Sequence, residues 1–184
     1  LNEITCIIDV PNTSGSIISY DEGNYGVWAY PNQQALQWIG IRFHSPETNI
    51  LSGVQTVFPP TFWPWNVNSY ILKIWEGWYG NKPDNLLFMY NGIVDWSLDI
   101  NRDGGWAYIS LLSENITLQE DNDYYIEFHN EGTGGVYAYD KATYSSSVAD
   151  GNSYYRASAN SNCNVLNDGD WNIRAVIGGC GTNN

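Results

Sequence analysis

The chain has 184 residues, which is enough to bury one core, and its 20 acidic residues against only 7 Lys and Arg give a formal net charge of −13. This charge argues against nucleic acid and anionic membranes as partners, because binding to either needs clustered cations. No apolar run approaches the roughly 20 residues that span a bilayer, so membrane insertion is not expected. The simplest role of so acidic a surface is to keep the protein soluble. Divalent cations are the ligands that such a surface would attract.

The first expected element is a strand over Leu1–Val10, in which Ile4, Cys6 and Ile8 occupy alternate positions. The turn formers that follow it separate residues 1–14 from the rest of the chain. This N-terminal segment is predicted either to be the first strand of the domain or to pair with a neighbouring subunit. In the second case Ile4, Cys6 and Ile8 are the expected interface residues.

Several further stretches alternate apolar and polar side chains with the period of a β-strand. In Tyr70–Glu76, Leu72 and Ile74 share one face while Lys73 lies on the other. Other strands are expected at Trp38–Phe43, Ile50–Phe58, Trp106–Leu112, Tyr124–Phe128 and Trp171–Ile177. Together they predict an all-β, two-sheet antiparallel β-sandwich with jelly-roll-like order. It is a single domain over residues 15–178, followed by a tail at 179–184.

Two parts of the chain leave the strand order open. Leu86–Tyr90 runs into Asn91-Gly92, the strongest short signal for a hairpin, although the same stretch also fits one long strand with a bulge. Residues 130–162 are rich in Gly, Ser and Tyr, and this composition predicts a loop region.

The three cysteines, Cys6, Cys163 and Cys180, match no metal or redox spacing. In an oxidising compartment, a Cys163–Cys180 disulfide would close a short loop and stabilise the fold by roughly 3 kcal/mol. A Cys6–Cys180 bridge would instead tie the two termini together. Either choice leaves one thiol, which would be buried or would link neighbouring chains.

An oxygen-rich turn is a candidate metal site. Asp99, Asn101 and Asp103 precede Gly104 with the spacing of the first half of a calcium-binding loop. Carboxylate and amide oxygens two residues apart can converge on Ca²⁺. The last ligand position is Ser110 instead of a bidentate Glu, so a hairpin turn without metal is the competing interpretation.

Prolines and aromatic residues meet between residues 58 and 65. Phe62, Trp63 and Trp65 are predicted to form an aromatic surface that could stack on the C–H faces of sugar rings. The same side chains would also suit a subunit contact, because large exposed apolar patches are unusual on monomers. A third interpretation folds them back over the core.

The sequence contains no Gly-x-Ser-x-Gly, His-Glu-x-x-His or phosphate-loop motif, and only two histidines occur. No catalytic residue is therefore expected, and the chain is predicted not to be an enzyme. The start at Leu1 instead of Met, and the glycosylation-type sequons at Asn12 and Asn115, favour a processed, exported protein. The expected location is extracellular or at the cell surface.

Short motifs in a fixed order carry a family resemblance. They are Ser19–Gly23, Trp38–Phe43, Leu72–Gly77, Leu86–Tyr90, Gly105–Leu111, Asp123–Phe128 and Asp170–Val176. Over Ile18–Ile177 the chain resembles the jelly-roll-like β-sandwich accessory modules of large secreted and cell-surface bacterial proteins, including those exported with type IX sorting tails. The resemblance implies a non-catalytic role in adhesion, display or assembly.

These observations predict a secreted, non-catalytic structural β-sandwich that is a subunit of an extracellular filament or surface assembly. Leu1–Val10 would leave its own globule and add a strand to the sheet of a neighbouring copy, where main-chain hydrogen bonds provide affinity and alternating side chains set the register. Bound Ca²⁺ or an interchain Cys6 bond would reinforce the joint. The alternative function is a carbohydrate-binding or adhesion module that uses Trp63 and Trp65.

Overall fold

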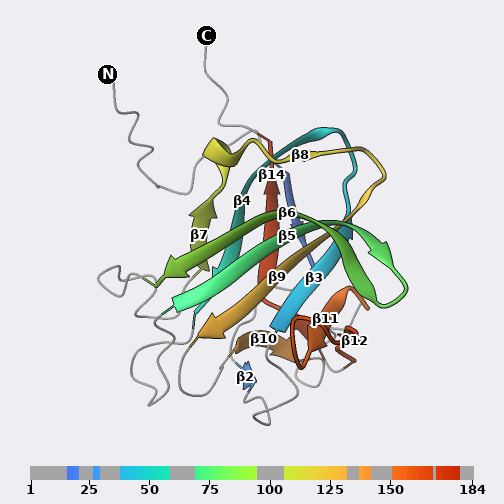
Figure 1. Cartoon of the computed structure of the whole chain (residues 1–184). Coiled ribbons are helices and arrows are strands. Elements are labelled where there is room, and N and C mark those ends of the chain that lie inside the picture. The colour runs from blue at the N-terminus through green and yellow to red at the C-terminus, as the bar shows by residue number, and fades with distance from the viewer. Residues whose placement is uncertain are drawn as a thin grey trace.

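The structure is a computed structural model that describes residues 16–20, 27–29, 38–58, 69–94, 106–131, 137–141, 151–167 and 169–178 (Figure 1). In these ranges the chain forms two antiparallel sheets, of five and six strands, that pack as a sandwich. The predicted all-β sandwich is therefore confirmed. The described residues include one short 3₁₀ helix, η1 (Leu112–Glu114), and no helix among them is long and apolar enough to cross a membrane.

The larger sheet has the strand order β12-β11-β3-β9-β5-β6, and each neighbouring pair in it is antiparallel. Its members are β3 (Trp38–His44), β5 (Ser69–Tyr79), β6 (Lys82–Ile93), β9 (Asp123–Glu131), β11 (Ser153–Arg156) and β12 (Asn164–Val165). The central strand β9 thus lies between β3 and β5, and β6 forms one edge of the sheet.

The smaller layer has the order β1-β14-β4-β7, with β8 pairing to β4. Its members are β1 (Ser16–Ser19), β4 (Asn49–Val57), β7 (Trp106–Ser110), β8 (Thr117–Leu118) and β14 (Ile173–Ile177). Figure 1 shows β6, β5, β9 and β3 running across the front of β7, β4 and β14. A separate three-stranded sheet joins β13 (Gly169–Trp171), β10 (Tyr137–Lys141) and β2 (Val27–Ala29).

The core is built from the alternate side chains that the sequence pattern assigns to the inner faces. Leu72 and Ile74 of β5 are fully buried, as are Val54 of β4 and Ile173 of β14 from the opposite sheet. Apolar burial of this kind is the main driving force for folding. The face of the six-stranded sheet that is turned away from this core is called the outer face below, and Lys73 lies on it.

The prediction of a hairpin at Asn91-Gly92 is wrong, and the alternative prediction of one long strand with a bulge is confirmed. β6 continues to Ile93, and the chain reverses earlier, at Gly80 and Asn81, where Gly80 has a φ of +60°. Gly92 pairs directly with Tyr70, and a Cβ at this position would lie 2.1 Å from the tyrosine ring. Gly92 is therefore required by close packing of an aromatic ring, and not by a turn.

Two other expectations need correction. Residues 130–162 are not all loop, because β10 and β11 lie within them. The strand expected over Trp171–Ile177 is divided at Asn172, where the chain passes from the three-stranded sheet to the five-stranded sheet. Long-range pairing explains both differences, since β11 pairs with β3 and β14 pairs with β4.

Candidate functional site

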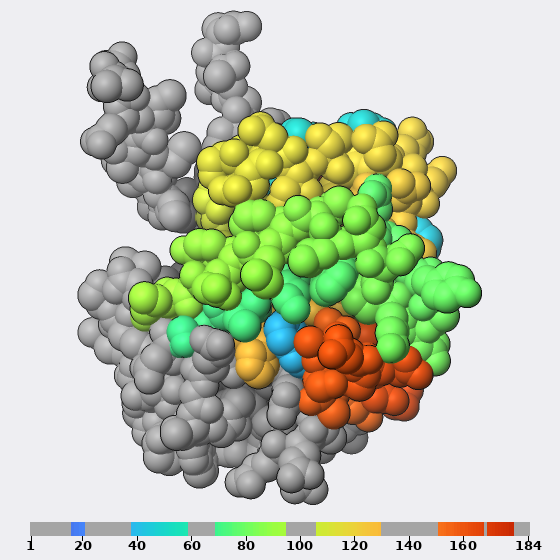
Figure 2. Space-filling view, in the orientation of Figure 1, coloured from blue at the N-terminus to red at the C-terminus, as the bar shows by residue number. Residues whose placement is uncertain are grey.

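The free edge of the six-stranded sheet is formed by β6, which pairs with β5 and with no other described strand. Large apolar side chains are exposed along it, and Figure 2 shows β6, in green, spread across the surface of the molecule. They are Leu86, Leu87, Met89, Tyr90 and Ile93. Proteins usually protect a sheet edge with charges, bulges or covering segments, because its unpaired main-chain groups attract further strands. An apolar edge of this kind indicates a partner.

A bulge divides this edge into two parts. Ile74 pairs with Phe88 and Trp75 pairs with Leu86, so Leu87 is an extra residue without a partner on β5. From Phe88 to Ile93 the pairing with β5 is regular. This six-residue stretch is consequently the part of β6 that can accept another strand in register.

Side chains from the stretch reach both faces of the sheet. Phe88 packs against the core cluster, and its ring is stacked on that of Tyr90 at 6.5 Å between centroids. Met89 lies on the outer face opposite Lys73 and is 53% exposed. A strand added here would cover apolar surface on both sides.

Cations gather on the outer face of the six-stranded sheet. Of the 7 Lys and Arg residues in the chain, Arg42, Lys73 and Arg156 lie on the outer face of β3, β5 and β11, and Lys82 begins β6. In a chain of net charge −13, this is a marked departure from the average surface. On the outer face these cations therefore offset the negative charge that prevails elsewhere in the protein.

A buried ion pair lies at the centre of the outer face. Arg156 donates from Nε and Nη2 to the two carboxylate oxygens of Glu127, both at 2.6 Å, and the two side chains are 2% and 0% exposed. Trp75 donates from its indole Nε1 to the same carboxylate at 3.3 Å. Burial raises the pKa of Glu127, while Arg156, Lys73 and Trp75 act in the opposite direction.

Two tryptophans enclose the cations beside this pair. The Lys73 Nζ lies 4.1 Å from the ring centroid of Trp38 and 5.6 Å from that of Trp75. On its other side Trp38 stacks on His129, with 4.6 Å between ring centroids. Desolvation lowers the pKa of Lys73, and the neighbouring Glu127 opposes this. The arrangement is packed, and it leaves little room for a ligand at this point.

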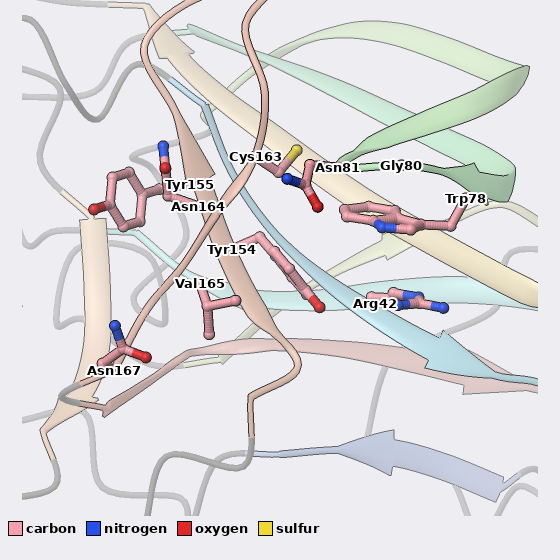
Figure 3. A pocket seen from close by; sticks show the side chains of 10 residues that line it. All are labelled: Arg42, Trp78, Gly80, Asn81, Tyr154, Tyr155, Cys163, Asn164, Val165 and Asn167. Atoms are coloured by element: carbon pink, nitrogen blue, oxygen red, sulfur yellow. The ribbon is translucent and has the colours of Figure 1, made fainter.

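A pocket of about 540 Å³ opens at the other end of the outer face (Figure 3). It is lined by Arg42 of β3, Trp78 near the end of β5, Tyr154 of β11, the turn at Gly80 and Asn81, and the segment 163–167. Figure 3 shows Trp78, Tyr154 and Arg42 gathered at one side of the pocket and Asn167 at the opposite side. This arrangement combines aromatic surface with hydrogen-bonding groups, as small-molecule sites do.

Arg42 is held in place within the pocket. It forms a two-point ion pair with Asp123, with Nε 3.1 Å and Nη2 2.5 Å from the carboxylate oxygens. Its guanidinium lies 5.1 Å from the ring centroid of Trp78, which in turn packs against Tyr154 at 4.9 Å. Asp123 and Tyr154 raise the pKa of Arg42 by hydrogen bonding, against the desolvation that lowers it. A fixed guanidinium can present its remaining N–H groups to a ligand.

The site residues expected from the sequence fall largely outside the described residues. This holds for the interface residues Ile4, Cys6 and Ile8, for the calcium ligands Asp99, Asn101 and Asp103, and for the aromatic surface of Phe62, Trp63 and Trp65. These assignments stay predictions. Within the part of the chain that the structure describes, no group of three or more His, Cys, Asp or Glu could hold a metal ion.

Cys163 is a free cysteine and is buried, while Cys180 lies outside the described residues. The structure thus contains no disulfide at Cys163, in contrast to the expected Cys163–Cys180 bridge. The Cys163 side chain is buried and its thiol lies beside Tyr125, while its N–H donates to the carbonyl of Asn81 at 2.8 Å.

Burial raises the pKa of the Cys163 thiol to about 11. At pH 8 we therefore expect iodoacetamide to alkylate Cys163 at least about 100-fold more slowly in the native protein than in urea, because the thiolate is the reacting form. Mass spectrometry of proteolytic fragments after timed alkylation measures this rate. Rapid labelling of native Cys163, or its recovery in a disulfide with Cys180, would contradict the buried free thiol.

Comparison with known proteins adds no relative: no family model matches the chain, and neither a curated protein nor a solved structure is similar to it. What the resemblance implied is confirmed at the level of a two-sheet antiparallel domain. With no relative to indicate a function, the free edge of β6 and the outer face are the features from which a function can be inferred.

Sequence reasoning missed the residues that make up the outer face. Arg156 and Tyr154 lie in the stretch expected to be loop, and Arg42 and Glu127 were placed on strands without a role. One signal was present: the few cations of an acidic chain fall on alternate strand positions beside tryptophans, as at Lys73. Such a pattern indicates a face that is electrostatically organised.

Proposed function

We propose that this chain is a secreted, non-catalytic β-sandwich that serves as a structural subunit of an extracellular assembly, joined by β-strand addition. The observation that supports the proposal is the free edge of β6, where Phe88–Ile93 is regular, unpaired on one side within the described chain, and apolar. Main-chain hydrogen bonds along such an edge provide affinity, and side-chain pockets on alternate residues provide specificity.

The proposed donor is Leu1–Val10 of a second copy. Its sequence alternates so that Ile4, Cys6 and Ile8 share one side, which suits the apolar side of β6 that carries Phe88 and Tyr90. The opposite side of the donor would place Ile7 near Met89. Ten residues are sufficient to span the six-residue stretch and fix a register.

The first test changes the acceptor edge. Met89→Glu should raise the protein concentration needed for half-maximal assembly at least about tenfold, equivalent to about 1.4 kcal/mol, because a charge on an edge strand opposes the addition of an apolar, acidic donor. The new carboxylate would lie opposite Lys73, so the monomer keeps its fold. Sedimentation velocity over a concentration series measures the assembly.

The matched control is Leu86→Glu, which makes the same change of charge on the same face, beyond the bulge. It should leave assembly unchanged. Deleting Leu1–Val10 should give a folded chain that does not polymerise, and a peptide of residues 1–10 should bind it. A chain that stays monomeric at every concentration, or a deletion variant that assembles as before, would rule the proposal out.

A further inference from the structure

The pocket at the end of the outer face is pre-formed. The Cys163 N–H donates to the Asn81 carbonyl at 2.8 Å, and the Lys82 Nζ donates to the Asn160 carbonyl at 2.8 Å. These bonds tie the 157–167 segment to the turn between β5 and β6, so both walls of the pocket are fixed before a ligand arrives. A ligand that enters a pre-formed pocket avoids much of the cost of ordering it.

The lining of the pocket is unusual for this chain. The protein has 20 acidic residues, and none of those that the structure describes lines the pocket. The one charged lining residue is Arg42, whose charge is balanced by Asp123. Among the described lining residues there are therefore no carboxylates for a divalent cation and no unpaired positive charge of the kind that a strong anion needs. A ligand of no net charge is the one that these electrostatics favour.

The groups that remain are those that recognise hydroxyl-bearing rings. Trp78 and Tyr154 contribute aromatic surface, and Asn81, Asn164 and Asn167 contribute amides that both donate and accept hydrogen bonds. Arg42 donates from Nε and Nη2 to Asp123 and is also hydrogen-bonded to Tyr154, so its guanidinium is held at the wall of the pocket beside the aromatic rings.

We propose that this pocket binds a neutral saccharide. One sugar ring stacks against Trp78, and its hydroxyls are held by the asparagine amides and by Arg42. The volume of about 540 Å³ lies in the range of small-ligand pockets, which run from roughly 300 to 1,000 Å³. None of the described lining residues belongs to the stretch Phe88–Ile93 of β6. The site therefore does not depend on strand addition.

Isothermal titration calorimetry of the full chain tests the site. The probes are neutral gluco-, xylo-, manno- and galacto-oligosaccharides, with oligogalacturonides as the acidic comparison. Asn81→Ala and Asn167→Ala should each weaken binding of the preferred neutral sugar at least about tenfold, since each removes hydrogen bonds to hydroxyls. Both side chains are exposed, so the melting temperature should be unchanged.

Tyr79→Ala is the matched control, because this tyrosine is 81% exposed near the pocket and does not line it. It should bind as the unaltered protein does. Saturable binding to a neutral saccharide that both asparagine variants weaken supports the site. Binding that neither variant changes, a salt-sensitive preference for oligogalacturonides, or no binding to any probe would overturn it. None of these results depends on whether the chain assembles.

Discussion

Replacing Arg156 by Ala should lower the free energy of unfolding by about 3–5 kcal/mol, because the Glu127 carboxylate is left buried without its charge partner. The side chain of Glu127 has no exposed surface, and Arg156 is the charged group that donates to both of its carboxylate oxygens. The variant also loses the bond from Arg156 Nη1 to the Ala159 carbonyl at 2.6 Å. Urea denaturation followed by circular dichroism measures the loss.

The loss of stability in Arg156→Ala should depend on pH in a defined direction. Burial already holds the pKa of Glu127 above its ordinary value of 4.5, and Arg156 is the largest influence that opposes this shift. Without Arg156 the pKa rises further in the folded state, so folding takes up a proton. The part of the destabilisation that comes from the unpaired carboxylate is then complete above the folded pKa and disappears as the pH falls to the unfolded pKa, while the loss of the bond to the Ala159 carbonyl remains at every pH. The difference in the free energy of unfolding between Arg156→Ala and the unaltered protein should therefore become smaller from pH 7 toward pH 4.5.

A double variant separates charge from shape. Arg156→Met together with Glu127→Leu removes both charges and keeps apolar volume, and such replacements are often neutral. The double variant should therefore be more stable than Arg156→Ala alone. If it were as unstable as the single variant, or if the single variant showed the same deficit at every pH, the loss would come from packing between Trp38 and Trp75 and not from an orphaned carboxylate.

The strands with a strict two-residue period could be predicted from sequence because their burial is decided locally. Leu72 and Ile74 alternate with Lys73, and any sheet that buries one face must place them as observed. Tyr124–Phe128 was recognised in the same way, although its central position between β3 and β5 was not. Alternation tells which side chains share a face, and says nothing about which strands are neighbours.

The strand β11 shows why the remaining elements could not be predicted. Its sequence, Ser153 to Arg156, has no apolar alternation, and its two buried ends are a serine and an arginine. Arg156 is stable in the interior only because Glu127, 29 positions earlier in the chain, lies beside it. No pattern of neighbouring residues indicates a buried ion pair between distant positions. The arrangement of the outer face, which depends on this pair, could therefore not be predicted from the sequence.

The role of Gly92 was predicted wrongly for a related reason. Asn91-Gly92 is a strong turn signal by itself, yet Gly92 accommodates the ring of Tyr70 on the paired strand. Gly40 and Gly53 likewise lie beneath the rings of Tyr125 and Tyr108. At these three strand positions, glycine makes room for an aromatic ring that crosses the sheet. That interpretation requires the pairing register, which only the structure supplies.

Gly40→Ala should accordingly cost about 3 kcal/mol or more, because a methyl group has no space at this position. A Cβ on Gly40 would lie 2.3 Å from the carbonyl oxygen of Ile126 and 2.6 Å from the ring of Tyr125. The first contact is with the backbone of the central strand β9, which cannot move without breaking its pairing with β3. Tyr125 is fully buried and has no alternative position.

Gly53→Ala is the matched control, since it makes the same chemical change on the central strand of the other sheet. There the three atoms nearest to a Cβ all belong to the side chain of Tyr108, the closest at 2.3 Å in the ring. Tyr108 is half-buried, so its ring can move outward more easily than a backbone can, and this movement would break its hydrogen bond to the Ser52 carbonyl. That loss is about 1 kcal/mol. Gly53→Ala should therefore be the less destabilising of the two variants in urea titrations. Equal destabilisation would show that the β9 backbone yields as readily as the half-buried ring of Tyr108, and the close approach of β3 and β9 would not be the constraint that selects glycine at position 40.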